Sequence, residues 1–124
     1  MSVLLKIFPE KRLVYSEFYG EVTSDEILHH GRVIKSHPQF DSAFSEIVDF
    51  TRVTRFSGSE KTLQQLAKTE SVFSADSKHA IIASAPLVYE LARAYQALAE
   101  SRILAVVQTR EQAFQFLGLE GDLG

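Results

Sequence analysis

The stretch Gly20-Glu21-Val22-Thr23-Ser24-Asp25-Glu26-Ile27 marks the clearest boundary between two structural elements in the chain. Thr23 and Glu26 have the spacing of a capping box, in which each side chain accepts a hydrogen bond from a backbone N–H at the start of a helix. A strand therefore ends here and a helix begins. We expect the helix to run to about Ser36, because the residue before Pro38 is pushed out of helical geometry.

Two apolar segments before this boundary predict a β-hairpin. Val3–Phe8 and Leu13–Tyr19 are rich in aromatic and branched residues, and Pro9-Glu10-Lys11 separates them. Gly20 closes the second segment. In the helix that follows, Gly31 shares a face with apolar residues. This placement predicts that the helix approaches the sheet closely.

Strands and helices then alternate along the rest of the chain. The predicted elements are a strand at Glu46–Phe50, a connection at Thr51–Phe56, a helix from near Ser57–Ser59 in which Ser57 and Glu60 have capping-box spacing, a strand at Ala80–Ala83, a helix from Pro86, a strand at Ile103–Val107 and a helix from Thr109 that Gly118 stops. We expect the helix from Pro86 to bury Val88, Leu91, Ala92, Tyr95 and Leu98. The order β-β-α-β-α-β-α-β-α predicts right-handed crossovers and an α/β fold with a mixed, mostly parallel sheet.

Length and composition favour one soluble domain over residues 1–124, with a frayed tail at 119–124. The chain has 124 residues, 45% of them hydrophobic, which is the size and composition of an ordinary globular domain. It has no cysteine, which excludes disulfides and thiolate metal sites. The net charge is −3 and no basic track is present, so we expect no nucleic-acid partner. No signal peptide and no apolar run of about 20 residues is seen, which predicts a cytoplasmic protein without membrane insertion.

Several segments are similar to those of a known fold family. They are Pro9-Glu10-Lys11-Arg12-Leu13-Val14 with Gly20-Glu21-Val22-Thr23, Pro38-Gln39-Phe40-Asp41 with Ile47-Val48-Asp49-Phe50-Thr51-Arg52-Val53-Thr54, Leu91-Ala92-Arg93-Ala94-Tyr95, and Ala113-Phe114-Gln115-Phe116-Leu117-Gly118. With the order of elements, they resemble the SpoIIAA-like fold of STAS domains and of a set of uncharacterised bacterial single-domain proteins. The resemblance implies helices packed against the sheet and a regulatory role without catalysis.

Signalling members of that family carry an Asp-Ser-Ser-Gly loop at a helix start, and the serine there is phosphorylated. This chain has Phe56-Ser57-Gly58-Ser59-Glu60 at the matching place. The acidic residue is missing, and glycine aligns with the phosphorylated serine. The resemblance therefore predicts that the fold is kept and the switch is lost.

The same loop is a candidate anion site or vestigial switch site. Ser57, Gly58 and Ser59 precede a predicted helix, whose exposed N–H groups and positive end favour an anion. Arg52 and Arg55 lie nearby in the sequence and would add positive charge. The alternatives are a serine that only caps the helix and arginines that are simply exposed.

Asp49 completes this candidate set, because it ends a predicted strand of an open α/β sheet, where functional groups are common. Its alternative role is a hydrogen bond to nearby backbone. The histidines at positions 29, 30, 37 and 79 form no converging set in the sequence, so no metal is predicted. No nucleophile elbow, dinucleotide fingerprint or P-loop is present, so we predict no catalytic residue and no cofactor.

A candidate interface is formed by aromatic and arginine side chains away from the predicted buried faces, at Phe40, Phe44, Phe56, Tyr89 and Arg93. Tyrosine and arginine are enriched in the energetically important parts of interfaces. Ordinary packing of these side chains within the domain is the alternative. The leading hypothesis is a non-enzymatic domain that binds a protein partner or itself. The second hypothesis is a sensor that holds a small ligand between the hairpin and the first two helices, and the third is a cryptic enzyme.

Overall fold

The computed structural model describes residues 3–69, 71–100 and 102–119. These residues form the strands β1 (Val3–Phe8), β2 (Leu13–Thr23), β3 (Ser45–Ser57), β4 (Lys78–Ile82) and β5 (Ile103–Val107), and the helices α1 (Ser24–Ser36), α2 (Glu60–Lys68), α3 (Pro86–Leu98) and α4 (Arg110–Leu117), with a 3₁₀ turn at Pro9–Lys11. The strands form one sheet in the order β1-β2-β3-β4-β5. β1 is antiparallel to β2, and the other neighbours are parallel. The predicted order of elements is confirmed.

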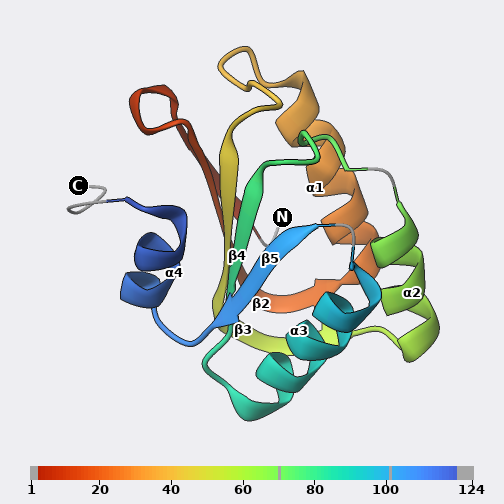
Figure 1. Ribbon diagram of the computed structural model, residues 1–124. Coiled ribbons are helices and arrows are strands. Elements are labelled where there is room, and N and C mark those ends of the chain that lie inside the picture. The colour runs from red at the N-terminus through yellow and green to blue at the C-terminus, as the bar shows by residue number, and fades with distance from the viewer. Residues whose placement is uncertain (1–2, 70, 101, 120–124) are drawn as a thin grey trace.

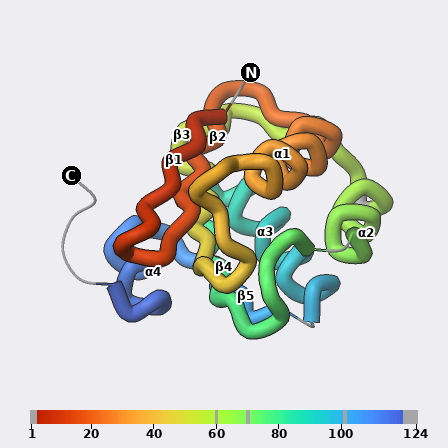
Figure 2. The backbone as a smooth tube through the Cα atoms, turned by 90° about the horizontal axis from the view of Figure 1, so that it is seen from above, coloured from red at the N-terminus to blue at the C-terminus, as the bar shows by residue number. Residues whose placement is uncertain are grey.

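The helices cover both faces of the sheet, three on one face and α4 on the other. Each crossover from β2 to β5 steps in the same direction, so right-handed connections place α1, α2 and α3 on one face. α4 follows the last strand and packs against the opposite face (Figures 1 and 2). The sheet is therefore the middle of three layers.

The central strands bury apolar side chains on both of their faces. Leu13 and Tyr15 of β2 face α4, where they form a core with residues of β3, β4 and α4. Val14 and Phe18 of β2 face the layer of three helices. Strands that are covered on both sides are expected to show this pattern.

Two strands are longer than predicted, and the sequence interpretation of Thr51–Phe56 as a connection is wrong. β2 continues through Gly20, which has a φ of 69°, to Thr23. β3 continues to Ser57, and its end pairs with the end of β2. The pairing contains register shifts around Gly20, and such irregularities bend a strand while it stays in the sheet.

Most helix ends follow the sequence signals. The Thr23 side chain accepts a hydrogen bond from the Glu26 N–H, and Thr109 forms a capping box with Gln112. The predicted capping pair of Ser57 and Glu60 is wrong, because Ser57 pairs with Thr23 in the sheet. α2 begins instead at a capping box of Ser59 and Thr62.

Two further expectations about burial need correction. Leu98 is 43% exposed, because α3 ends there and the side chain lies beyond the packed part of the helix. Leu119 packs against the core on the α4 side, so it is not part of a frayed tail. Residues 120–124 of the predicted tail lie outside the described residues.

Candidate functional site

A cavity of about 540 Å³ lies between the sheet and the layer of α1, α2 and α3. Its floor is formed by apolar side chains of the sheet, and its walls by apolar side chains of the three helices. The floor residues are Phe18, Val48, Phe50, Ile81 and Leu104, and the wall residues include Ile27, Ile34, Leu63, Leu66, Val88 and Leu91. This volume lies within the range of about 300–1,000 Å³ that is typical of small-molecule sites.

The cavity exists because α2 packs on its neighbouring helices more than on the sheet. α2 contacts α1 and α3 more extensively than it contacts any strand. Its apolar residues Leu63 and Leu66 are buried, but they belong to none of the four hydrophobic clusters of the core. They therefore face the cavity from the side opposite the sheet.

Gly31 also faces this cavity, which corrects the expectation of a close approach to the sheet. A methyl group placed on Gly31 would meet no atom within 4 Å, apart from its own helix backbone and chain neighbours. Gly31 lines the cavity wall on α1. The missing side chain thus adds space to the cavity instead of bringing two elements together.

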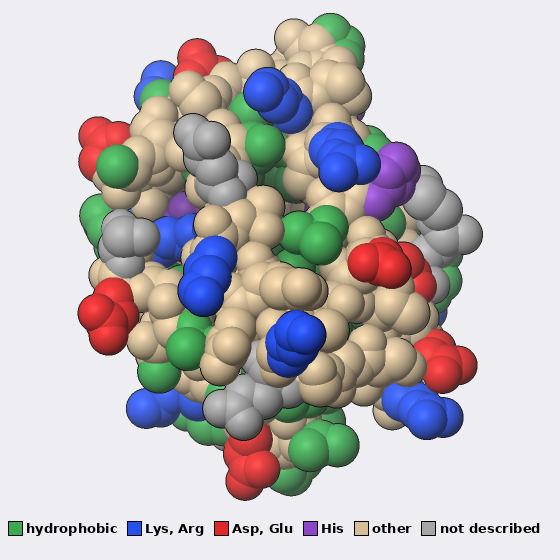
Figure 3. Space-filling model, turned by 90° about the vertical axis from the view of Figure 1, so that its right-hand side faces the viewer, with side chains coloured by type: hydrophobic (Ala, Val, Ile, Leu, Met, Phe, Trp, Pro, Cys, Tyr) green, Lys and Arg blue, Asp and Glu red, His purple; other side chains and the backbone are tan. Residues whose placement is uncertain are grey.

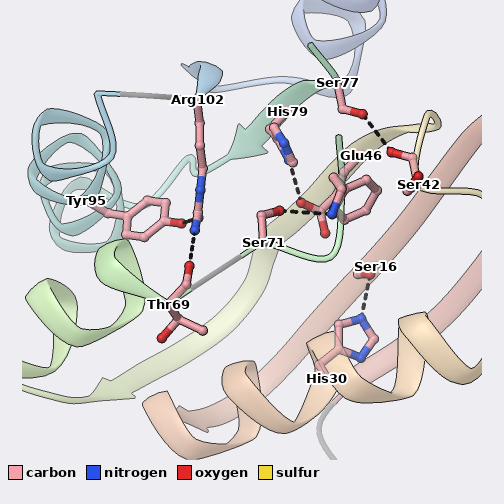
Figure 4. Close-up of polar contacts among 11 residues, drawn as sticks. Ser16, His30, Ser42, Glu46, Thr69, Ser71, Ser77, His79, Tyr95 and Arg102 are labelled. Atoms are coloured by element: carbon pink, nitrogen blue, oxygen red, sulfur yellow. Dashed lines mark hydrogen bonds and ion pairs between the residues drawn. The ribbon is translucent and has the colours of Figure 1, made fainter. Parts of the chain in front are cut away.

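A polar corner of the cavity is built by Arg102, Tyr95 and Thr69 (Figure 4). Arg102 directly precedes β5, and its guanidinium donates hydrogen bonds to the Tyr95 hydroxyl of α3 and, at 2.6 Å, to the Thr69 carbonyl at the end of α2. The guanidinium also lies over the Tyr95 ring, 5.8 Å from its centroid. Burial raises the pKa of Tyr95, Arg102 partly offsets this effect, and Glu46 adds to it, so the hydroxyl stays protonated.

A second polar pair, Glu46 of β3 and His79 of β4, lines the same cavity. His79 Nδ1 lies 2.9 Å from Glu46 Oε1, and the side chains are 10% and 16% exposed. An ionised carboxylate only accepts hydrogen bonds, so His79 Nδ1 carries the proton.

A third polar pair, His30 of α1 and Ser16 of β2, lies between the helix layer and the sheet. His30 Nε2 is 2.6 Å from Ser16 Oγ, and both residues are buried. The ring packs edge-on against Phe18. Burial lowers the pKa of His30, the nearby Glu46 acts in the opposite direction, and His29 lowers it further. His30 is therefore neutral at pH 7.

The predicted anion site is not brought together by the described contacts. Ser59 caps α2, and Ser57 ends β3. Gly58 is required here because an added methyl group would lie 2.4 Å from Phe56 Cε1. Arg52 and Arg55 bind Glu17 and Glu21 of β2, at 3.0 and 3.8 Å.

Asp49 lies within β3 and faces α4, on the opposite side of the sheet from the cavity. It is 4% exposed and accepts hydrogen bonds from the Tyr15 hydroxyl at 2.5 Å, the Thr51 N–H at 2.9 Å and the Thr51 hydroxyl at 2.7 Å. The bond to the Thr51 N–H is the backbone contact that the alternative interpretation predicted.

The predicted interface residues are dispersed over the domain. Phe44 is 5% exposed, so it is not available on the surface. Phe40 packs edge-on against Phe73, and Phe56 lines the cavity. Tyr89 is half-buried in the core cluster near α3, and its hydroxyl accepts a hydrogen bond from the exposed Arg93.

The outer surface of the helix layer carries interspersed Lys or Arg and Asp or Glu side chains (Figure 3). Within residues 3–69, 71–100 and 102–119, no three His, Asp or Glu side chains come together as a metal ion would require. No helix in this part of the chain has both the length and the apolar character needed to cross a bilayer.

Sequence reasoning missed the polar groups of the cavity. Glu46 carried a weak signal, because it is one of two charged residues, with Asp49, in a predicted strand that is otherwise apolar. His79 lies in β4, and the parallel register pairs it with Glu46. Arg102 carried no signal, nor did Ser71, which also lines the cavity, because both lie in connections whose direction depends on how the helices pack.

Comparison with known proteins identifies the fold. No protein-family model and no curated protein matches the sequence. The structure is similar to that of an uncharacterised protein of the DUF3478 family with a SpoIIAA-like fold, from Shewanella loihica PV-4. The two chains share 13% sequence identity, and the match has a TM-score of 0.60 and covers 93% of this chain and 91% of the other. The chain has a SpoIIAA-like fold, as its sequence predicted.

Proposed function

We propose that this protein binds a small, largely apolar ligand in the cavity between the sheet and α1, α2 and α3. The cavity itself carries the proposal. Protein interiors are close-packed and contain few voids larger than a water molecule. The cavity is partly open to solvent, and water inside it finds few hydrogen-bond partners along its mostly apolar lining. An apolar ligand that displaces such water gains affinity.

A ligand in the cavity contacts apolar side chains on both sides. Leu63 and Leu66 approach from one side, and Phe50 and Ile81 from the other. The ligand's own apolar surface gains about 25 cal/mol per Å² when it moves from water into this lining. A ligand of apolar character thus gains free energy along most of the cavity.

The test is a titration with N-phenylnaphthylamine, a neutral dye that fluoresces in apolar surroundings. We expect saturable binding by the unmodified protein. Gly31→Phe places a ring in the open space beside α1 and should weaken binding about tenfold or more, equivalent to about 1.4 kcal/mol. Gly31→Ala is the matched control, because a methyl group occupies little of the cavity. Equal affinity for the Phe and Ala variants would contradict the proposal.

Protein recognition is a second candidate function, favoured by the exposed apolar residue Leu87. Its side chain is 69% exposed at the first turn of α3, on the helix that also carries Arg93. A second copy of the chain is the simplest partner to test. We expect light scattering after size exclusion to show a dimer that Leu87→Asp dissociates. A monomer at all concentrations would contradict this role.

A further inference from the structure

The corner of the cavity around Arg102 contains more hydrogen-bond donors than acceptors. The Tyr95 hydroxyl oxygen accepts a bond from Arg102, and Ser71 Oγ accepts one from the Phe73 N–H at 3.1 Å. Neither hydroxyl donates a bond to another described residue. Tyr95, Ser71 and Arg102 all line the cavity (Figure 4).

No acidic side chain pairs with Arg102 among residues 3–69, 71–100 and 102–119. The ion pairs among the described residues join Arg52 to Glu17, Arg55 to Glu21 and His79 to Glu46. The guanidinium has five N–H donors, and the described contacts use two of them, with Tyr95 and Thr69. A negatively charged ligand would accept charge-assisted hydrogen bonds from the remaining N–H donors.

Glu46 is the acidic residue among the described residues that line the cavity, and its charge acts on Tyr95, whose pKa it helps to raise. One of its oxygens is held by His79 Nδ1. In the view of Figure 4, Ser71 lies between Glu46 and Arg102. On α1, His30 is neutral at pH 7 and bonded to Ser16, and the exposed Arg32 and Lys35 also line the cavity. The positive charge of Arg102 and the two hydroxyl protons therefore remain together at the Arg102 end.

We propose that the ligand is an amphipathic carboxylate whose head group binds Arg102, with the Tyr95 and Ser71 hydroxyls as further donors, while its apolar chain fills the rest of the cavity. A carboxylate matches the planar fork of a guanidinium and accepts two of its N–H bonds. The apolar chain then runs between the sheet and the leucines of α2. This inference rests on the proposed function, because it assigns the head group of the same ligand.

The test compares decanoate, decanol and decylamine, which share one chain and differ in charge. Each displaces the neutral dye from the protein at pH 8, where the acid is ionised. We expect decanoate to bind about tenfold more tightly than decanol, because its carboxylate gains a charge-assisted hydrogen bond from Arg102. Decylamine should bind most weakly, because its positive charge is repelled by Arg102. Equal binding of decanoate and decanol would overturn the carboxylate assignment and leave the proposed function standing. Failure of all three to bind would refute both.

Substitution of Arg102 provides a second test of the carboxylate assignment. Arg102→Gln should reduce the affinity for decanoate to that for decanol and leave decanol binding unchanged. Arg93→Gln, at an exposed arginine on α3, is the control and should keep the preference for the acid. A preference that survives Arg102→Gln would overturn the assignment. If Arg102→Gln does not fold, Arg102→Lys is the substitute: it keeps the positive charge and must retain part of the preference for decanoate over decanol. The comparison of decanoate, decanol and decylamine on the unmodified protein tests the carboxylate assignment without any substitution.

Discussion

At the residue scale, the Tyr15 and Asp49 pair shows why a buried acid in a strand need not be a functional group. Asp49 accepts three hydrogen bonds and joins β3 to β2 through Tyr15. Arg110 of α4 donates to the Tyr15 hydroxyl and lies over its ring. Burial and the neighbouring carboxylate raise the pKa of Tyr15, so its hydroxyl remains a donor to Asp49. These contacts fix α4 and two strands together.

Tyr15→Phe should therefore lower stability without affecting the cavity. The substitution removes one donor from a buried carboxylate, which costs about 1–3 kcal/mol in the free energy of unfolding. Urea unfolding measures this loss, and dye binding should stay unchanged because Tyr15 faces the other side of the sheet. Tyr89→Phe, which removes a half-buried hydroxyl bonded only to an exposed arginine, should change stability by less than about 0.5 kcal/mol. Equal stability of the Tyr15 variant and the unmodified protein would refute the anchoring role.

His30 makes a second residue-scale prediction, about pH. Its pKa in the folded protein is lowered by burial, so the unfolded chain binds a proton more readily. Stability should therefore be fully present above the unfolded pKa of about 6.5 and fall as the pH decreases below it. His30→Gln should flatten this dependence, as measured by urea unfolding from pH 8 to pH 5. His29→Gln, at an exposed neighbour, should leave it intact. Identical pH profiles for the His30 variant and the unmodified protein would show that another group is responsible.

At the element scale, α2 differs from the other helices because it packs mainly on α1 and α3 and little on the sheet. Its apolar side chains face a cavity, while α1, α3 and α4 contribute residues to hydrophobic clusters that include strand residues. Segments with few apolar contacts open at lower free energy than the core. Amide hydrogen exchange should therefore be faster in α2 than in α1 or α3. Addition of a cavity ligand should slow exchange in α2 most, and uniform protection in all helices would contradict this account.

The same scale shows what the sequence could predict and what it could not. Helix starts at Thr23 and Thr109 and the stop at Gly118 were predictable, because a cap depends on residues within one turn. The second half of β3 was not predictable as a strand, because exposed charged residues such as Arg52 interrupt its apolar pattern. That segment is a strand only through pairing with the end of β2, which is about 35 residues away in the sequence.

At the scale of the whole molecule, the sequence predicted the order of the elements and a mostly parallel sheet but could not predict the cavity. Sequential strands and right-handed crossovers determine which helices share a face. The distance between α2 and the sheet depends on how three helices pack on one another. No pattern of neighbouring residues in the sequence predicts that distance. The polar corner has the same origin, because Arg102, Tyr95 and Thr69 come from three elements.

The most direct test of the cavity as a ligand site is methyl NMR with decanol, whose neutral head group separates this question from the carboxylate assignment. The account predicts intermolecular nuclear Overhauser effects from the decanol chain to the methyl groups of Leu63, Leu66 and Ile81. Leu13 and Ile82, which belong to the core on the α4 side, should show none. Contacts to that side of the sheet, or chemical shifts that do not change with decanol, would contradict the account.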